Sequence, residues 1–348
     1  MPSLMPRKVL IALTLPAVLA VSGCWFDSAP EEVRLTGETM GTTYSVIAIG
    51  EDLDQEALGS AVEGTLAAVN AKMSNWDPAS EVSTFSAERS TAPVRVSPEF
   101  AHVLAAANDV HAKTGGKFDV TLGPLIELWG FGPRKPEDPV PSDAAIAKAL
   151  EGVGQARLLV LDAEAGTLKK SAPETGINLS AIAKGYGVDA VAEALQRFGV
   201  EHYLVEIGGD LVTKGENAKG EAWRIGIEKP DAAAQTVQLI VPVSNHGLAT
   251  SGDYRNYFEH EGKRYSHILD PVAGRPVTHA TTSVTVIAEN AMLADAWATA
   301  MLVLGRENGL KLAEQHKLAV FFIDRDVQAG PDAYMTAASS AFEALTAN

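Results

Sequence analysis

The stretch LDPVAGRPVTHATTSVTVIAENAMLADAWATAMLVLG, residues 269–305, contains a turn, a strand and a helix, three kinds of element that recur along the whole chain. Glycines and prolines mark the turn, and residues 283–288 predict a β-strand. From about Ala291 the stretch is strongly apolar and predicts a helix, which nevertheless contains Asp295 and Thr299. These two residues are four apart and therefore project from the same helix face. A carboxylate in so apolar a helix needs a partner.

Helices and strands are mixed along the rest of the chain without a regular βαβ repeat, which favours an α+β fold over a doubly wound sheet. Apolar spacing and capping residues predict helices in residues 54–73, 97–116 and 142–154, and a loop that runs into a helix in residues 177–200. We expect Ser97 and Ser180 to be N-caps. Turn signals and β-rich runs predict a strand in 37–50, a hairpin in 156–172 and two strands in 202–215. The proline-rich residues 130–143 predict a loop.

The length and charge of the chain limit its possible partners. Its 348 residues suffice for one large domain or two of medium size. The formal net charge of −16 argues against a nucleic-acid partner, because phosphates are bound through Lys and Arg. This charge does not argue against a small anionic ligand, since a local basic group can lie in an acidic protein.

The N-terminus has the arrangement of an export signal. Two basic residues precede the apolar run VLIALTLPAVLAV, which is short for a membrane-spanning helix, and VSGC follows. This order closely resembles a bacterial lipoprotein signal, in which Cys24 becomes the lipidated first residue. Ordinary cleavage that leaves a free cysteine is the alternative; Cys24 is the sole cysteine, so no internal disulfide forms. We expect a lipoprotein signal peptide in residues 1–23, a tether in 24–34, and one domain in 35–345.

Asp295 and Thr299 have two interpretations. A carboxylate beside a hydroxyl supplies hard oxygen ligands, which suit Mg²⁺ together with substrate phosphate and water. The alternative is that Asp295 bonds a nearby backbone amide while Thr299 packs as a small core residue. The residues alone favour this second interpretation.

Lys184 and two glycine-aspartate turns are further candidates. Lys184 follows Ser180 in the first turn of a predicted helix, where unpaired N–H groups and an ammonium attract an anion. A plain capped helix with an exposed lysine is the alternative. The segments EIGGDL and ATSGDYRN each place glycine before aspartate, which permits close approach to a ligand but is more typical of a simple turn.

Three more side chains carry possible chemistry. Asp119 lies among small residues, and Trp76 could stack on a flat heterocycle, although an isolated tryptophan is more often a core residue. His267 precedes a turn-rich segment and is the histidine best suited to acid–base work. A structural hydrogen bond for His267 is an equal alternative.

Several common sites are absent from the sequence. It contains neither a P-loop motif nor a Rossmann fingerprint after a strand, and no G-x-S-x-G nucleophile elbow. One cysteine cannot build a zinc or iron–sulfur framework. The residues by themselves therefore indicate an exported α+β protein, and binding of Mg²⁺ and of a phosphate-bearing ligand is one open interpretation of its charged side chains.

Eight motifs, in this order, resemble those of the ApbE family, the FAD:protein FMN transferases. They span Thr39 to Gly305 and read TMGTTYSV, MSNWDPASEVSTF, GGKFDVTLGPLIELWGFGP, INLSAIAKGYGVDAV, VEIGGDL, ATSGDYRNYF, YSHILDPVAGRPV and TTSVTVIAENAMLADAWATAMLVLG. Each motif alone is weak, but chance does not produce eight in order. The resemblance implies a single large two-lobed α+β domain, related to the T-fold, with the flavin nucleotide between its halves.

The resemblance also implies an activity and a set of site residues. Members of this family take FAD, use Mg²⁺, release AMP and join FMN through a phosphoester to a threonine hydroxyl of an acceptor protein. By position, the FAD site would be lined by Met40, Trp76, Asp119, Val120, Thr121, Asn178, Lys184 and Leu269. Mg²⁺ would be held by the backbone carbonyl of Ala181, the carboxylate of Asp295 and the hydroxyl of Thr299. His267 would activate the acceptor threonine.

The family's acceptors are membrane redox subunits, including those of sodium-pumping NADH:quinone oxidoreductase and Rnf-type complexes. The expected location is the bacterial cell envelope, lipid-anchored and facing the periplasm, on either the inner or the outer membrane. Two other functions stay open. One is a Mg²⁺-dependent FAD pyrophosphatase that gives FMN and AMP, and the other is a non-enzymatic flavin-binding lipoprotein.

Overall fold

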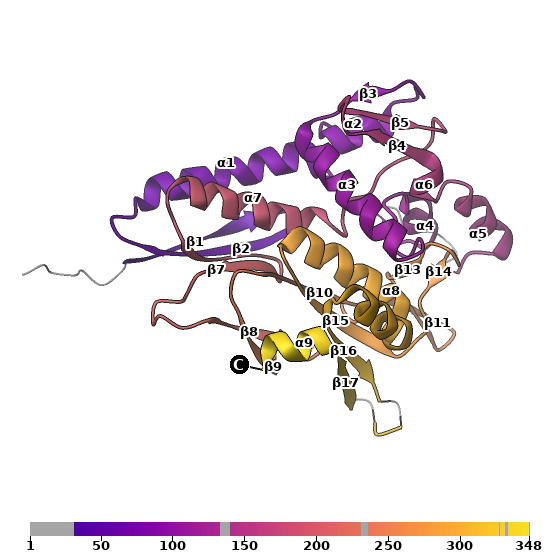
Figure 1. The fold of residues 1–348 in the computed structure, drawn as a ribbon. Coiled ribbons are helices and arrows are strands. Elements are labelled where there is room, and N and C mark those ends of the chain that lie inside the picture. The colour runs from indigo at the N-terminus through magenta and orange to yellow at the C-terminus, as the bar shows by residue number, and fades with distance from the viewer. Residues whose placement is uncertain (1–30, 133–139, 231–235, 327, 331–332, 348) are drawn as a thin grey trace, which may run out of the picture.

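An eight-stranded sheet forms the centre of the fold in the computed structural model, which describes residues 31–132, 140–230, 236–326, 328–330 and 333–347 (Figure 1). Its strand order is β1-β2-β6-β7-β10-β15-β16-β17, and every neighbouring pair is antiparallel. The strands are β1 Glu31–Thr39, β2 Thr42–Gly50, β6 His202–Ile207, β7 Asp210–Lys214, β10 Gly247–Gly252, β15 Thr281–Ala288, β16 Ala319–Arg325 and β17 Tyr334–Ala338. This arrangement confirms the α+β prediction.

Alternating side chains divide the core between the two faces of this sheet. In β2, Val46 and Ala48 enter the core under the helices, whereas Ile47 and Ile49 face the opposite core. Strand β16 repeats the pattern, since Val320 lies on the helix side and the next residue points away. Because successive strand residues point to opposite faces, a sheet that is apolar on both sides must be covered on both sides.

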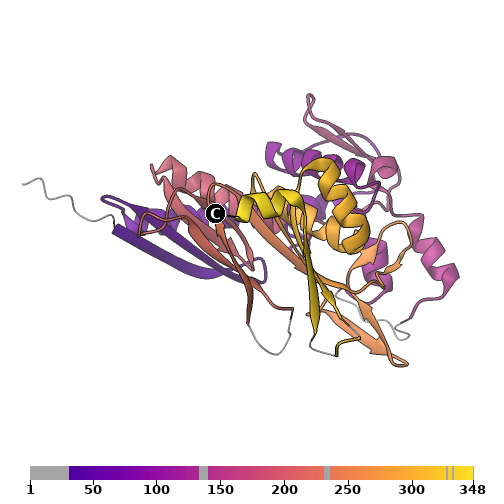
Figure 2. The same cartoon turned by 60° about the horizontal axis from the view of Figure 1, so that its bottom comes forward.

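Long helices cover one face, and a small layer covers the other (Figures 1 and 2). The long helices are α1 Gln55–Met73, α7 Ala183–Arg197 and α8 Ala291–His316. The second face carries the β-hairpin of β8 Trp223–Glu228 and β9 Val237–Val243, with helix α9 Ser340–Thr346 beside it. The site described below lies where α7 and α8 meet the sheet.

The chain between α1 and α7 and a segment after β10 build the second lobe. Its helices are α2 Glu81–Ala87, α3 Pro98–Lys113, α4 Gly123–Leu128, α5 Asp143–Leu150 and α6 Gln155–Leu158. Its strands are β3 Val94–Arg95, β4 Leu159–Asp162 and β5 Thr167–Lys170 in one small sheet, with the pairs β11 Tyr257–His260 and β12 Lys263–Ser266, and β13 Leu269–Asp270 and β14 Arg275–Pro276. The upper right of Figure 1 shows most of this lobe.

Several local predictions are confirmed. Helix α3 starts after the cap Ser97, whose hydroxyl accepts from the N–H of Phe100, and Pro98 occupies its first position. Helix α8 begins at Ala291 as expected, and it has a kink at Gly305, where φ is 71°. Among the described residues, no helix combines the length and apolar character needed to cross a membrane.

Three predictions need correction. Residues 37–50 contain the end of β1, a turn and β2, because Met40 and Gly41 adopt positive φ and reverse the chain. Residues 31–34 belong to β1, with Glu31 opposite Gly50, and not to a tether. Ser180 does not cap α7, which starts later, at Ala183, without a side-chain cap of its own. The signal peptide, Cys24 and the rest of the tether lie outside the described residues.

Candidate functional site

Asp295 lies in a buried cluster of charges contributed by three separate elements. Its Oδ2 atom accepts from the backbone N–H of Gly185 at 3.2 Å and lies 3.9 Å from Nζ of Lys184. Lys184 in turn forms an ion pair with Asp210, the first residue of β7. Both aspartates are almost completely buried, at 4% and 1% exposure. The fold therefore brings Lys184 close to Asp295, which lies 111 residues later in the chain. It also brings Asp210 into the same cluster, which the sequence analysis did not predict.

Electrostatics couple the three groups. Burial alone would lower the pKa of Lys184, but the facing carboxylates of Asp295 and Asp210 raise it above its ordinary value. Burial and then the carboxylate of Asp295 raise the pKa of Asp210, despite the nearby ammonium. With both carboxylates ionised, the cluster would carry one net negative charge, and the raised pKa reflects the cost of that charge in a buried position. A further cation would offset this charge.

Close backbone packing makes the cluster possible. At Gly185 an added Cβ would lie 2.2 Å from the carbonyl oxygen of Ala291, and at Gly247 it would lie 2.2 Å from the N atom of the same residue. Only glycine permits such an approach, so α7, α8 and β10 come close enough for Gly185 to reach Asp295. The glycine in the sequence AKGYGVD is thus a packing requirement of the site.

Thr299 lies one helical turn beyond Asp295 on α8. Its hydroxyl is 3.1 Å from the hydroxyl of Ser251 in β10. The residue is partly exposed, whereas its helix neighbours are buried. Asp295 and Thr299 therefore project from one face of α8, as their spacing predicts.

The donor set around Asp295 fits Mg²⁺ in its chemistry. A carboxylate and a hydroxyl are hard oxygen ligands, and a bound cation would offset the surplus negative charge that the cluster carries when both carboxylates are ionised. In the described part of the chain, no three His, Cys, Asp or Glu side chains gather as a metal site. An ion here would therefore depend on Asp295, Thr299, a backbone carbonyl such as that of Ala181, and oxygens of the substrate. The bond from Gly185 also agrees with the alternative in which Asp295 binds a backbone amide.

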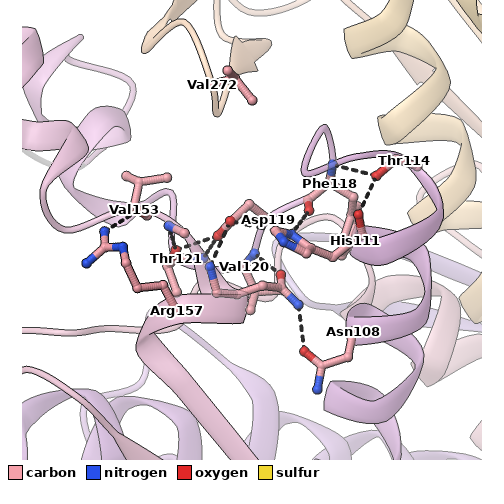
Figure 3. A network of polar contacts seen from close by, with 12 residues as sticks. Asn108, His111, Thr114, Phe118, Asp119, Val120, Thr121, Val153, Arg157 and Val272 are labelled. Carbon is pink, nitrogen blue, oxygen red and sulfur yellow. Dashed lines mark hydrogen bonds and ion pairs between the residues drawn. The ribbon is translucent and has the colours of Figure 1, made fainter.

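A second buried carboxylate, Asp119, belongs to a different network. Its Oδ1 accepts from the N–H of Thr121 at 2.7 Å and from the hydroxyl of the same residue, and its Oδ2 accepts from the N–H of Gln155 at 2.9 Å. Nδ1 of His111 lies 3.5 Å from Oδ2. Figure 3 shows Asp119 between His111 and Thr121. These donors fix the loop of residues 119–121 between α3 and α4.

The segment from Asn178 to Lys184 joins this loop to the charged cluster. The N–H of Asn178 donates to the carbonyl oxygen of Val120 at 2.7 Å. The side chain of Asn178 accepts from the N–H and the hydroxyl of Ser180. The hydroxyl that we expected to cap α7 is therefore bound to Asn178 instead. Ala181 follows and packs against the core. Predicted FAD-site and metal-site residues therefore alternate along one short segment.

Met40 lies against the start of α7, and Trp76 lies beside the segment that precedes this helix. An added Cβ at Gly187 would lie 2.7 Å from the terminal methyl of Met40, so this side chain rests on the first turns of α7. Asn75 bonds the N–H of Leu179 and the carbonyl of Ile177, which holds the neighbouring Trp76 beside the segment. Trp76 is 77% exposed, so it is not a core residue and its indole is available to a ligand.

His267 and Leu269 form a third group. Nδ1 of His267 lies 2.9 Å from the carbonyl oxygen of Asn256, so this nitrogen carries the proton and Nε2 keeps its lone pair. Burial lowers the pKa of His267, which favours the neutral ring. Leu269 is buried with Trp129 in a small apolar cluster.

An ion pair connects the segment of His267 and Leu269 with the segment of Asp119. Lys117 and Asp270 are 2.6 Å apart and bring the Leu269 turn to the Asp119 loop. Within the described residues, the structure gives no direct contact between His267 and Asp295. The roles of the individual residues in binding FAD or Mg²⁺ stay predictions.

Asp210 is the site residue that sequence reasoning missed. The segment EIGGDL looks like an ordinary turn, and Gly208 and Gly209 do adopt positive φ there. The available signal was a charged residue directly before the apolar residues Leu211 and Val212 of a strand, because a charged residue that is buried needs a partner. Lys184 is that partner.

An antiparallel sheet under helices, with a half-buried lysine between two buried carboxylates, defines an α+β protein with a perturbed internal charge site of the kind found in enzymes. Residues 40–322 match the model of the ApbE family. A Vibrio cholerae protein named FAD:protein FMN transferase is 41% identical over 97% of this chain and 98% of its own length. A Haemophilus influenzae protein of the same name is 39% identical over 97% and 99%.

Solved structures agree. The flavin transferase ApbE from Vibrio cholerae superimposes with a TM-score of 0.81 at 40% identity, covering 91% of this chain and 99% of that one. The Pseudomonas stutzeri flavinyl transferase ApbE in its apo form gives 0.82 at 38% identity, covering 92% and 98%. The chain therefore belongs to the ApbE family, and it is a transferase enzyme.

Proposed function

We propose that this chain transfers FMN from FAD to a threonine hydroxyl of an acceptor protein, in a Mg²⁺-dependent reaction that releases AMP. The new phosphoester forms between the threonine oxygen and the FMN phosphorus as the bond from that phosphorus to the AMP oxygen breaks. The names of the relatives support FAD as substrate and protein as acceptor. The observation that carries the proposal is the buried cluster of Lys184, Asp210 and Asp295, with Thr299 one turn away.

In this proposal, Asp295, Thr299 and the carbonyl of Ala181 hold Mg²⁺. When bound, the ion neutralises charge on the diphosphate oxygens of FAD. Lys184 supplies a second positive charge at the start of α7, where N–H groups also face an anion. Asp210 keeps the ammonium in place. The chain's main task is thus to position and neutralise the diphosphate, as is usual in phosphoryl transfer.

His267 is the proposed base for the acceptor hydroxyl. The hydrogen bond between Nδ1 and the carbonyl of Asn256 leaves Nε2 as the basic atom. The lowered pKa keeps this atom unprotonated at neutral pH. Nε2 takes the threonine proton as the oxygen attacks phosphorus.

Met40, Trp76, Asp119, Val120, Thr121, Asn178, Lys184 and Leu269 are proposed to line the FAD site. The contacts that tie the segment 178–187 to Met40, Val120 and Asn75 support this assignment. Trp76 is the exposed aromatic surface on which a flat ring of FAD would stack.

The chain is further proposed to work at the bacterial cell envelope, anchored by lipid at Cys24 and facing the periplasm. Its acceptors would be membrane redox subunits, such as those of sodium-pumping NADH:quinone oxidoreductase or Rnf-type complexes. The order of residues at the N-terminus supports the anchor. A Cys24→Ser variant should be released from membranes or stay unprocessed, and membrane association after normal processing would contradict the anchor.

The test of the activity is an incubation with FAD, Mg²⁺ and an acceptor protein bearing a flavinylation threonine, followed by in-gel flavin fluorescence. Transfer predicts a fluorescent acceptor band and equimolar AMP. An acceptor with that threonine changed to alanine is the control and should give no band. Free FMN and AMP without a band would indicate a pyrophosphatase, and unchanged bound FAD would indicate a carrier.

A further inference from the structure

Asp189 of helix α7 binds the first turn of helix α8. Its Oδ1 accepts from the N–H of Ala291 at 2.9 Å, and its Oδ2 accepts from the N–H of Met292 at 2.8 Å. These are the first two residues of α8, whose N–H groups have no partner within the helix. Both oxygens of one carboxylate are therefore used to cap a helix that begins 102 residues later in the chain.

Helix α8 already has a local cap. The side chain of Asn290 accepts from the N–H of Leu293 at 2.8 Å. This bond serves the third residue of the helix, whereas Asp189 serves the first two. A local cap stabilises its own helix end, but it does not fix that helix against another. Asp189 does both.

The contact is one half of a reciprocal pair. Gly185, one turn before Asp189 on α7, donates its N–H to the carboxylate of Asp295, one turn after Ala291 on α8. Each helix thus presents a carboxylate to the N-terminal N–H groups of the other. Helix α7 has no side-chain cap from its own start, so Asp295 is the cap that it receives from α8.

This reciprocal pairing lies close to the site residues of both helices. Lys184 precedes Gly185, and Thr299 lies one turn beyond Asp295, so a shift of α8 along α7 would move every one of these groups. Of the two glycines at the crossing, Gly247 supplies close approach and Gly185 adds one polar contact, the long bond to Asp295 at 3.2 Å. The carboxylate of Asp189 adds the two shorter bonds that fix the sliding position.

We infer that Asp189 is a positioning residue that sets the register of α8 against α7, and through it the placement of Asp295 and Thr299 relative to Lys184. It acts through these residues and contacts no substrate. The consequence for transfer rests on the proposed function, whereas the consequence for the register does not.

The experiment compares Asp189→Ala and Asp189→Asn with the control Asn290→Ala, which removes a cap from the same helix end. Both alanine variants should lower Tm by about 1–4 °C, because each loses helix-cap hydrogen bonds. Of the two alanine variants, only Asp189→Ala should lower kcat for FMN transfer, by about 10–100-fold, as expected when a group that orients site residues is lost. Asp189→Asn keeps one acceptor oxygen and should lie between wild type and Asp189→Ala.

Amide hydrogen exchange at Gly185 gives a readout independent of activity. This N–H lies in the first turn of α7, so its protection comes from Asp295 and not from the helix. It should exchange faster in Asp189→Ala and at the wild-type rate in Asn290→Ala. Equal exchange and equal kcat in the two alanine variants would overturn the inference. A wild-type enzyme without transfer activity would contradict the proposed function, and the exchange rates would still decide the role of Asp189.

Discussion

Asp295 and Asp119 are both buried aspartates in predicted site segments, but their partners differ in kind. Asp119 receives two backbone N–H groups and a hydroxyl, with a histidine nitrogen close by. Asp295 receives one backbone N–H, faces an ammonium at 3.9 Å, and shares that ammonium with a second carboxylate. Asp119 is thus held by donors that fix a loop, whereas the Asp295 cluster carries a surplus negative charge whenever both of its carboxylates are ionised.

This difference predicts different consequences of losing each carboxylate. A carboxylate with three or more donors is a structural centre, because its removal leaves buried donors without partners. A carboxylate in a crowded, negatively charged cluster costs stability and is better explained by a ligand that neutralises it. The Asp119 network should be needed for folding, and the Asp295 cluster for chemistry.

The largest expected effect is that of Asp295→Ala on transfer. Loss of the carboxylate would remove the main charged ligand proposed for Mg²⁺, and transfer should fall by about 10³–10⁵-fold. Thermal stability should fall only by the small amount expected for one lost cap bond at Gly185, since Lys184 keeps its ion pair with Asp210. Transfer kinetics and a thermal melt on the same preparation check this, and a collapse of folding would instead make Asp295 mainly a structural residue.

The next effect concerns His267, in the third group of residues. His267→Ala should bind FAD normally and lose transfer by about 10²–10⁴-fold, the usual effect of removing a general base. Flavin fluorescence measures the binding, and the in-gel assay measures the transfer. A parallel loss of binding and transfer would assign His267 to ligand positioning.

Asp119→Ala tests the other half of the comparison, which is the structural role of the Asp119 network. It leaves the N–H groups of Thr121 and Gln155 without their acceptor, so the free energy of unfolding should fall by about 2–4 kcal/mol. Urea denaturation measures this, with Asp295→Asn as the matched control that should change by less than about 1 kcal/mol. Unchanged stability in Asp119→Ala with lost FAD affinity would make this carboxylate a ligand contact.

The smallest expected effect is on pH dependence. Burial lowers the pKa of His267 in the folded protein, so its base form persists below the ordinary histidine value of about 6.5. The acid limb of kcat/KM should therefore lie below pH 6.5. Between the folded and unfolded pKa values the unfolded chain binds more protons, so this histidine makes stability fall as pH falls through that window. An acid limb above pH 6.5 that His267→Gln leaves unmoved would contradict the assignment.

Sequence reasoning recovered the parts of this site that depend on local rules. Helix spacing places Asp295 and Thr299 on one face, and Lys184 lies in the first turn of a helix as predicted, although the expected cap Ser180 is not used. The α+β class follows from the absence of a βαβ repeat. These conclusions need only neighbours in the chain.

The partnerships across the chain could not be read in the same way. Asp210 meets Lys184 because β7 lies beside β10 under α7, and EIGGDL alone indicates only a turn. Ser180 is not a cap because the side chain of Asn178 bonds it first, and α7 receives Asp295 instead. Such choices depend on which distant group competes for a donor, and local propensity does not contain that information.

The central claim is that the Asp295 cluster holds the cation that neutralises the FAD diphosphate. The most direct test is a Mg²⁺ titration of FMN transfer by wild type and by Asp295→Asn, which keeps the shape of the side chain and removes its charge. The account predicts saturable activation of wild type, and activity near background for the variant at every Mg²⁺ concentration, with closely similar melting temperatures. An Asp295→Asn enzyme with wild-type Mg²⁺ dependence would contradict it.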